Sequence, residues 1–302
     1  MLDGPALGQL LALGSATSFA VANNMISRTT RSGGDKGVMF SVLVTMGISG
    51  LLWLALEAGR TGLGAGGSAR IGLAWFAFAG LMAMVFGRTL VFASIRTLGV
   101  ARSTAVKRLN PFFSVLLAAL ILGEVVTGTD IAGMAAIAVS FAILIRESFA
   151  RGTRVKAPPP AAYLLGVAAA LAYAVSYIAR KLGLETLPTP AFGTFVSAVS
   201  GFAVFSALAL VLPRHRANFR QMFAHLDRWI VFGAVFVSGG QILLFAALNY
   251  ESVSTVVMIA SLEIFISILL SVLVFRSEAR PGPPVLAAAG LATLGVVLVA
   301  AS

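Results

Sequence analysis

The chain has 302 residues, of which 59% are hydrophobic and only 11% charged, and its mean hydropathy is +0.97. A soluble domain of this length needs more polar surface, so the composition excludes an ordinary water-soluble protein. The net charge of +11 would indicate nucleic acid in a soluble protein, but here the basic residues lie mainly in short connections between apolar runs. Cysteine is absent, which excludes disulfides, thiolate nucleophiles and Cys-based metal sites.

Ten apolar segments have the length that crosses the hydrocarbon core of a bilayer, which takes about 20 residues. Each is predicted to be a helix, because backbone groups in lipid must be satisfied within the segment. In chain order they are Ala6–Ser27, Val38–Leu56, Ile71–Ser94, Val100–Leu122, Thr129–Ile145, Ala161–Arg180, Pro190–Leu212, Trp229–Leu248, Val253–Phe275 and Pro283–Ala301.

The second half of the chain repeats the first at an offset of about 153 residues. Gly80 to Leu122 aligns with Gly233 to Phe275 without a gap, and 12 of the 43 positions are identical. The identical first-half residues are Gly80, Gly87, Leu90, Phe92, Ala93, Val100, Leu109, Phe112, Ser114, Leu116, Leu117 and Leu120. This similarity exceeds what two apolar helix pairs share through composition alone, so it indicates a duplication.

An odd number of spans in each half places the two halves upside down relative to each other, as in secondary transporters. The fold class predicted is an all-α polytopic membrane protein with ten helices in a 5+5 inverted repeat around a central cavity. The predicted units are residues 1–150, a hydrophilic connector at 151–160 that contains Pro158-Pro159-Pro160, and residues 161–302.

Arginine and lysine favour one side of the predicted membrane protein. Odd-numbered connections carry 15 of these residues, whereas even-numbered ones carry only Arg60, Arg70, Arg180 and Lys181. Cytoplasmic connections are enriched in Arg and Lys, so the odd connections are predicted in the cytoplasm and both termini on the periplasmic side of a bacterial inner membrane.

Glu263 is the most informative polar residue, because it lies midway through the ninth span. An ionised acid there costs on the order of 3 kcal/mol or more, so it must face a cavity, find a partner or be protonated. Its repeat counterpart is Asn110, which is followed by Pro111, and a proline inside a helix kinks it and frees a carbonyl.

Two polar stripes at matching depth predict a shared central cavity. One helix face carries Ser103, Lys107, Asn110 and Ser114, and the equivalent face carries Ala260, Glu263, Ser267 and Ser271. The alternative is a buried Lys107–Glu263 or Arg88–Glu263 pair that only locks the bundle.

Further candidates for the cavity lie on other spans, although a polar side chain within a span is more often an interhelical hydrogen bond. Arg88 in the third span has Gln241 as its counterpart in the eighth. Tyr173, Tyr177 and Arg180 share a face of the sixth span, and Asn23 lies late in the first.

Enzyme motifs are absent or lack their context. Gly62, Gly64 and Gly67 match GxGxxG without a preceding strand, there is no Walker A sequence, and no histidine lies in a span to serve as a base. His215 and His225 lack metal-ligand spacing. We therefore expect no enzyme activity, no metal and no cofactor.

Small residues recur at every fourth position of the fifth span, at Ala132, Ala136 and Ser140. They fit close helix contact, either within the chain, which is favoured, or at a dimer seam. The partners expected are a small-molecule substrate and the lipid bilayer, with no nucleic acid. The oligomeric state stays open, and a monomer is consistent with the sequence.

The chain resembles the drug/metabolite transporter superfamily, in particular its EamA-type exporters. The resemblance is carried by Ala101 to Glu124, with Pro111 and the closing Leu122-Gly123-Glu124, and by Asp130 to Gly133 before an apolar fifth span. Three features depart from the pattern: Ile264 replaces the repeated proline, Arg276-Ser277-Glu278 replaces Leu-Gly-Glu, and Phe19 and Tyr173 stand where tryptophan is common. The YddG-like amino-acid exporters are the branch it resembles most.

The resemblance implies export of small metabolites, often amino acids, through a cavity between the halves. From the residues themselves, Lys107 or Arg88 could bind a carboxylate, Glu263 an ammonium, and Tyr173 and Tyr177 could form an apolar wall. A proton-coupled exporter of multiple cationic drugs is the first alternative. A membrane scaffold or sensor that transports nothing is the second.

Overall fold

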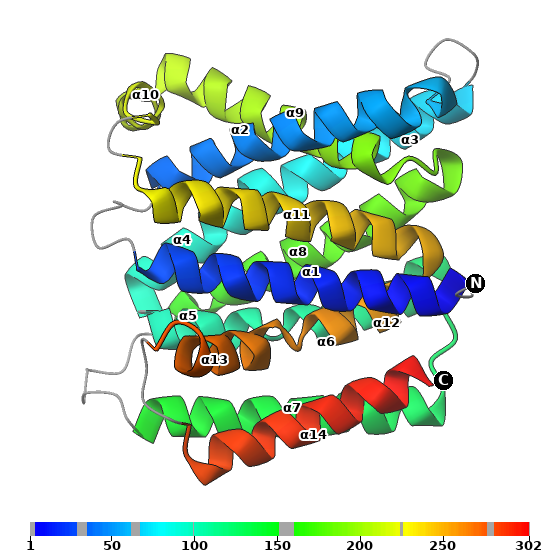
Figure 1. The fold of residues 1–302 in the computed structure, drawn as a ribbon, viewed down its shortest axis with the longest axis vertical. Coiled ribbons are helices and arrows are strands. Elements are labelled where there is room, and N and C mark those ends of the chain that lie inside the picture. The colour runs from blue at the N-terminus through cyan, green and yellow to red at the C-terminus, as the bar shows by residue number, and fades with distance from the viewer. Residues whose placement is uncertain are drawn as a thin grey trace.

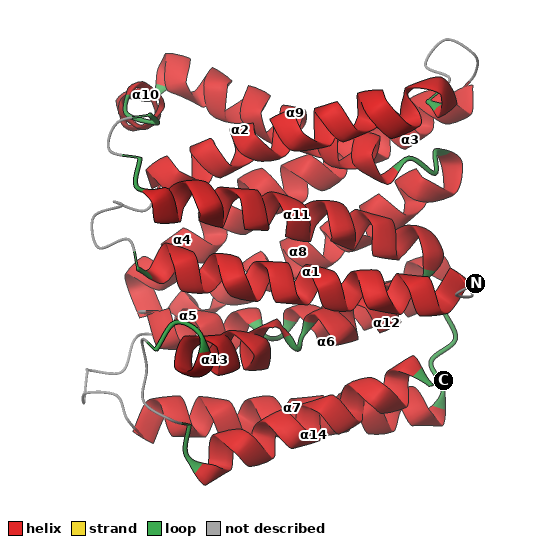
Figure 2. Ribbon diagram, viewed as in Figure 1, coloured by secondary structure: helices red, strands yellow, loops and turns green. Residues whose placement is uncertain are grey.

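The computed structural model describes residues 4–28, 35–61, 67–98, 100–150, 160–223, 226–276 and 281–301. Within these ranges every regular element is a helix (Figure 2). The central connector at 151–159, Gly62, Gly64 and His225 lie outside the described residues.

Ten helical segments in the described part of the chain are long and apolar enough to cross a membrane, which confirms the all-α polytopic prediction. Six spans are single helices: α1 (Gly4–Ser27), α7 (Gly128–Ala150), α8 (Pro160–Thr186), α9 (Pro190–Val211), α11 (Arg228–Tyr250) and α14 (Pro283–Ala300). The second span joins α2 (Asp35–Leu52) to the π-helical turn η1 (Trp53–Glu57), which η2 (Ala58–Arg60) follows. The third span joins α3 (Gly67–Gly80), η3 (Leu81–Gly87) and α4 (Arg88–Leu98). The short helix α10 (Pro213–Arg220) was not predicted and lies in the polar connection after α9.

The fourth and ninth spans are each broken in the middle, at equivalent positions of the repeat. The fourth consists of α5 (Val100–Lys107), α6 (Asn110–Leu117) and η4 (Ala118–Leu122). The ninth consists of α12 (Val253–Ala260) and α13 (Glu263–Leu273). The helix boundaries of the fourth span at 100, 107 and 110 each recur in the ninth span at the offset of 153 residues, so the duplication extends to the local backbone.

The first span of each half packs into the other half. Helix α1 lies along α11 and also contacts α12 and α13, and α8 contacts α3, α4, α5 and α6 (Figure 1). We call α3–α6 with η3, η4 and α8 the first group, and α1 with α11–α13 the second group. The remaining spans form two pairs, α2 with α9 and α7 with α14. Each group therefore combines helices from both halves.

Helices α7 and α14 meet through small residues. A Cβ atom on Gly133 would lie 2.5 Å from the Gly295 carbonyl oxygen, and one on Gly295 would lie 2.6 Å from the Gly133 oxygen. The Ser140 hydroxyl donates to Ala288 O over 2.7 Å. Ala136 and Ser140 therefore pack against α14 within the chain, whereas Ala132 of the same stripe is exposed.

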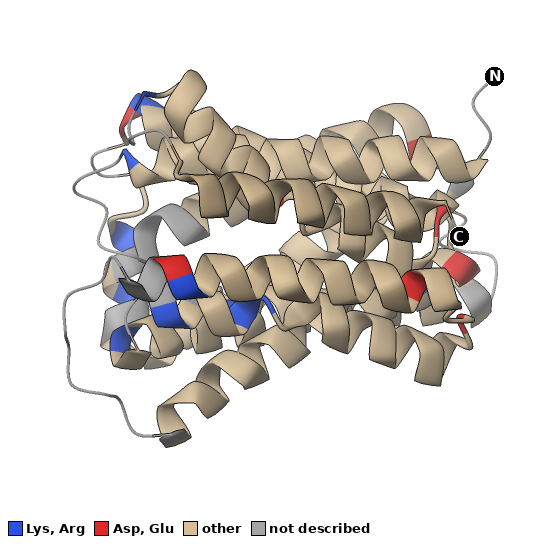
Figure 3. Cartoon of the chain, turned by 90° about the horizontal axis from the view of Figure 1, so that it is seen from below, with Lys and Arg blue, Asp and Glu red and all other residues tan. Residues whose placement is uncertain are grey.

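Both ends of the chain lie on the same side of the bundle (Figure 1). The lysines and arginines that the structure describes gather mainly at the opposite end (Figure 3). The charge asymmetry seen in the sequence is therefore an asymmetry between the two faces of the folded protein.

Candidate functional site

The two helix breaks have the same hydrogen-bond pattern. Leu109 N–H donates to Val106 O, and its counterpart Leu262 N–H donates to Ile259 O, both over 3.0 Å. These tight i to i−3 bonds replace the α-helical pattern for one turn. After the break, α6 and α13 begin with Asn110 and Glu263, so the repeat places these two side chains at matching depth.

Glu263 is anchored by a residue of the first span. The Asn23 amide donates to Glu263 Oε1 over 2.6 Å, which joins α1 to α13 within the second group. Glu263 is half-buried, whereas Asn23 is exposed. The contact gives the carboxylate a neutral hydrogen-bond partner and leaves its remaining lone pairs available to a cation.

Lys107 at the end of α5 faces the same region from the first group. Its ammonium lies 5.4 Å from the centre of the Tyr173 ring, a cation–π distance, and it interacts electrostatically with Glu263. Lys107 is nevertheless exposed. The Lys107 side chain therefore contacts Tyr173 of α8 and is still accessible to a ligand.

Asn110 and the residues around it form a second set of contacts. Asn110 is buried and interacts with Tyr177. The Ser114 hydroxyl donates to Asn110 O over 2.9 Å. On the other stripe, Ser267 is engaged by Asn24, whose amide donates to Ser267 Oγ over 2.9 Å, so Ser267 joins α13 to α1.

Arg180 belongs to the same cluster, although the charge pattern of the sequence predicted it in a connection. Helix α8 continues to Thr186, so Arg180 and Lys181 lie within the sixth span, and the count of basic residues in even connections falls accordingly. Arg180 is only 2% exposed, and its Nη2 donates to Gln241 Oε1 over 3.0 Å. Its seven-residue spacing from Tyr173 predicts instead a shared face of the sixth span with Tyr173 and Tyr177, and the position of the guanidinium beside the Tyr177 ring agrees with that prediction.

The Arg180 guanidinium has spare hydrogen-bonding capacity. It lies 4.6 Å from the Phe245 ring centre and 5.5 Å from that of Tyr177, but its Nε and Nη1 atoms are buried without a hydrogen-bond partner. Arg88 also belongs to this wall, where it is half-buried and interacts with Tyr173. Unmet buried donors are costly, so they are expected to find a partner at some stage of the protein's action.

The cluster has two walls of opposite character. The first group supplies the cations Arg88, Lys107 and Arg180 with Tyr173 and Tyr177, and the second group supplies the acid Glu263 with Asn23, Gln241 and Ser267. The structure thus brings the predicted candidates together at one boundary between groups. Because the two walls belong to different groups, any ligand held by both would join them.

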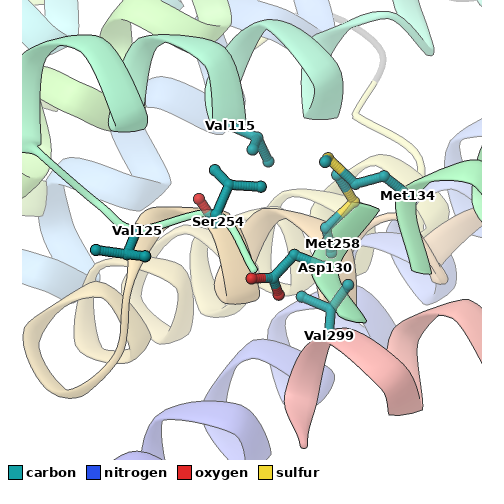
Figure 4. Close-up of a pocket in the computed structure, with 8 residues that line it drawn as sticks. Val115, Val125, Asp130, Met134, Ser254, Met258 and Val299 are labelled. Carbon is teal, nitrogen blue, oxygen red and sulfur yellow. The ribbon is translucent and has the colours of Figure 1, made fainter. Parts of the chain in front are cut away.

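A small separate pocket lies towards the terminal end, between α7, α12 and α14 (Figure 4). Asp130, Met134, Ser254, Met258 and Val299 are among its lining residues. It has room for about one water molecule. It is too small for a metabolite, so it does not serve as a substrate site.

Ten spans, a doubled five-span unit and a polar cluster between the groups define a polytopic membrane protein of the transporter class. The model of the EamA-like transporter family matches residues 6–146 and 160–301. The chain belongs to this family and so to the drug/metabolite transporter superfamily, and its role is transport across a membrane. The two matched regions fit the inverted repeat.

Solved structures support the fold. Among 29 matching chains, one named only "Crystal structure of protein" has a TM-score of 0.73 and 15% sequence identity, and the match covers 96% of this chain and 95% of the other. At this identity the similarity concerns the fold alone. The search of curated proteins gave no match.

Proposed function

We propose that this transporter exports small zwitterionic metabolites, most simply amino acids, by alternating access of the site between the two groups. The observation that carries the proposal is the separation of charge across that site. Cations lie on the first group and Glu263 lies on the second, so a molecule with a carboxylate and an ammonium matches both walls.

Lys107 and Glu263 are the proposed ligands for the two charges of the substrate. A zwitterion that binds between them replaces the direct electrostatic interaction of Lys107 with Glu263. Charge-assisted hydrogen bonds are stronger than neutral ones, and they gain in strength when water is excluded. The hydrogen bonds to the substrate would therefore offset the free energy that is needed to bring the two walls together and exclude water.

Arg180 is proposed to hold the substrate carboxylate in part of the cycle. Its Nε and Nη1 are buried donors on different sides of the guanidinium, and neither atom has a partner in this structure, so each could donate to a carboxylate oxygen. Gln241 accepts from the third nitrogen of the guanidinium, Nη2. The anionic group of the substrate would satisfy donors that the protein leaves unmet.

The proposed location is the inner membrane of a bacterium, with the termini on the periplasmic side. The gathering of Lys and Arg at the end away from the termini supports this orientation (Figure 3). Unit boundaries at residues 150 and 160 are likewise proposed from the sequence.

Transport by purified protein in proteoliposomes tests the proposal. With radiolabelled amino acids, Glu263→Gln and Lys107→Ala are each expected to reduce the initial rate about tenfold or more, since loss of one charge-assisted contact costs about 1.5–3 kcal/mol. Glu185→Gln is the matched control, because Glu185 is exposed near the end of α8. Unchanged transport in both site variants would remove these residues from the mechanism.

The same vesicles separate the alternative functions. Transport of cationic dyes driven by a pH gradient, with no amino-acid flux, would identify a multidrug exporter in which Glu263 binds protons. No flux of any solute, together with a co-purifying partner, would identify a scaffold or sensor.

A further inference from the structure

The turn between α11 and α12 is held by two oppositely charged side chains of the first group. Helix α11 ends at Tyr250 and α12 begins at Val253, on the side of the bundle where the termini lie (Figure 1). This turn belongs to the second group. Glu124, just after η4, and Lys181, near the end of α8, reach it across the boundary between the groups.

Glu124 binds the beginning of α12. Its Oε1 accepts from Val253 N–H over 2.7 Å, and its Oε2 accepts from Ser254 N–H over 3.0 Å and from the Ser254 hydroxyl over 2.6 Å. The first N–H groups of a helix have no partner within the helix and carry partial positive charge. A carboxylate is therefore the group that matches this end.

Lys181 binds the end of α11. Its ammonium donates to Leu248 O and to Glu251 O, each over 3.0 Å. The last carbonyl groups of a helix carry partial negative charge, which a lysine matches. The first group thus holds both helix ends of one turn with the charge that suits each, and we call Glu124 and Lys181 the clamp.

The opposite end of the bundle has a different arrangement. At the repeat offset of about 153 residues, Arg28 in the first span corresponds to Lys181 in the sixth. The Arg28 guanidinium donates to Phe275 O and lies 5.0 Å from the centre of the Trp229 ring. Phe275 lies just after α13 and Trp229 lies in α11, so both contacts stay within the second group, to which Arg28 is attached through α1. Within the described part of the chain, Arg28 contacts its own group, whereas Lys181 ties one group to the other.

We infer that the clamp is the gate on the side of the termini, and that this structure is the state closed to that side. Five hydrogen bonds between the groups must break before the site can open there. Because Glu124 and Lys181 bind backbone groups of the turn, the gate does not depend on which substrate is carried. The inference uses the alternating access of the proposed function but not its substrate.

The absence of cysteine from the sequence makes the test direct, since paired spin labels need no prior substitutions. Leu10→Cys on α1 and Glu185→Cys on α8 place labels on the two groups at the terminal side, where both residues are exposed. Thr97→Cys on α4 and Leu273→Cys on α13 do the same at the opposite end. Pulsed electron–electron double resonance in nanodiscs gives the distance distribution of each pair.

Glu124→Gln is expected to add a longer distance to the Leu10/Glu185 pair and to shorten the Thr97/Leu273 pair. Glu57→Gln is the matched control, because Glu57 also accepts from two N–H groups of a helix, Ala191 N and Phe192 N, over 3.0 and 2.9 Å. Its bonds join η1, at the end of the second span, to α9, and both spans lie outside the two groups, so both distributions should keep their wild-type form.

Wild-type distributions in Glu124→Gln, or the same lengthening in Glu57→Gln, would overturn the gate. If Glu124→Gln does not yield monodisperse protein, Lys181→Gln replaces it and is expected to lengthen the same pair. An unchanged distribution in Lys181→Gln would then refute the clamp. The measurement contains no substrate, so failure of the gate and failure of the amino-acid proposal are observed separately.

Discussion

Arg180 shows at the scale of one residue how stability and function diverge in this protein. It is the largest of the fully buried side chains in the described residues, and two of its nitrogen atoms have no hydrogen-bond partner. An uncompensated buried charge destabilises a fold by several kcal/mol. Arg180 also reaches Gln241 on the other wall, and under the proposed function the substrate would use its spare donors.

Arg180→Met separates these two effects. The change removes a buried cation and keeps an apolar chain of similar reach, so we expect a thermal midpoint in detergent that is equal to or above that of the wild type. Transport in proteoliposomes should fall about tenfold or more, since the charge-assisted contact to the substrate is lost.

Arg180→Lys is the comparison for this prediction. It restores a cation but not the fixed planar set of N–H donors of a guanidinium, so only part of the lost rate should return. Normal transport in Arg180→Met, or a midpoint well below the wild type, would contradict the proposed role.

At the scale of helices, close crossings depend on glycine. A Cβ atom on Gly80 in α3 would lie 2.3 Å from Ser197 O and 2.7 Å from Ser197 Cα in α9. Both are backbone atoms, so α3 and α9 would have to separate. Gly47 in α2 instead has nothing within 4 Å of the same position.

The same substitution is therefore expected to have opposite effects at these two sites. Gly80→Ala should lower the thermal midpoint, with a cost of about 1–3 kcal/mol for overpacking. Gly47→Ala should hold or raise it, because alanine favours the helix by up to about 1 kcal/mol over glycine. Thermal unfolding of both variants checks this, and equal shifts would show that the α3–α9 crossing does not limit stability.

The two helix breaks show how far a local sequence signal extends. Pro111 explains the break before α6, because proline has no N–H to offer the Lys107 carbonyl. The ninth span has Ile264 at the equivalent position, yet it breaks between Ala260 and Glu263. No proline therefore accounts for the second break.

At the scale of the whole molecule, orientation follows from charge. Since basic residues gather at the end opposite the termini, a reporter fused after Ser302 is expected outside the cytoplasm (Figure 3). Alkaline phosphatase should be active and green fluorescent protein dark at this position in bacterial cells. Fluorescence with an inactive phosphatase would place the termini in the cytoplasm and reverse the predicted orientation.

The sequence by itself determined the ten spans, their helical state, the doubled unit and the family. These follow from hydrophobic length and from repetition along the chain, which need no knowledge of contacts. It also indicated the depth of Asn110 and Glu263, because each lies midway through its span. The charge count placed Arg180 in a connection because a charged residue near the end of an apolar run resembles the start of one, whereas the helical spacing placed it on one face with Tyr173 and Tyr177.

Only the tertiary structure decided which helices act together. Helix α1 packs with the second half and α8 with the first, and no periodicity within one segment specifies that exchange. The bond from Asn23 to Glu263, the burial of Arg180 against Gln241 and the hold of Glu124 and Lys181 on one turn all depend on it. Such contacts join residues that are 61 to 240 positions apart in the sequence. They therefore arise from packing between helices rather than from the sequence around either partner.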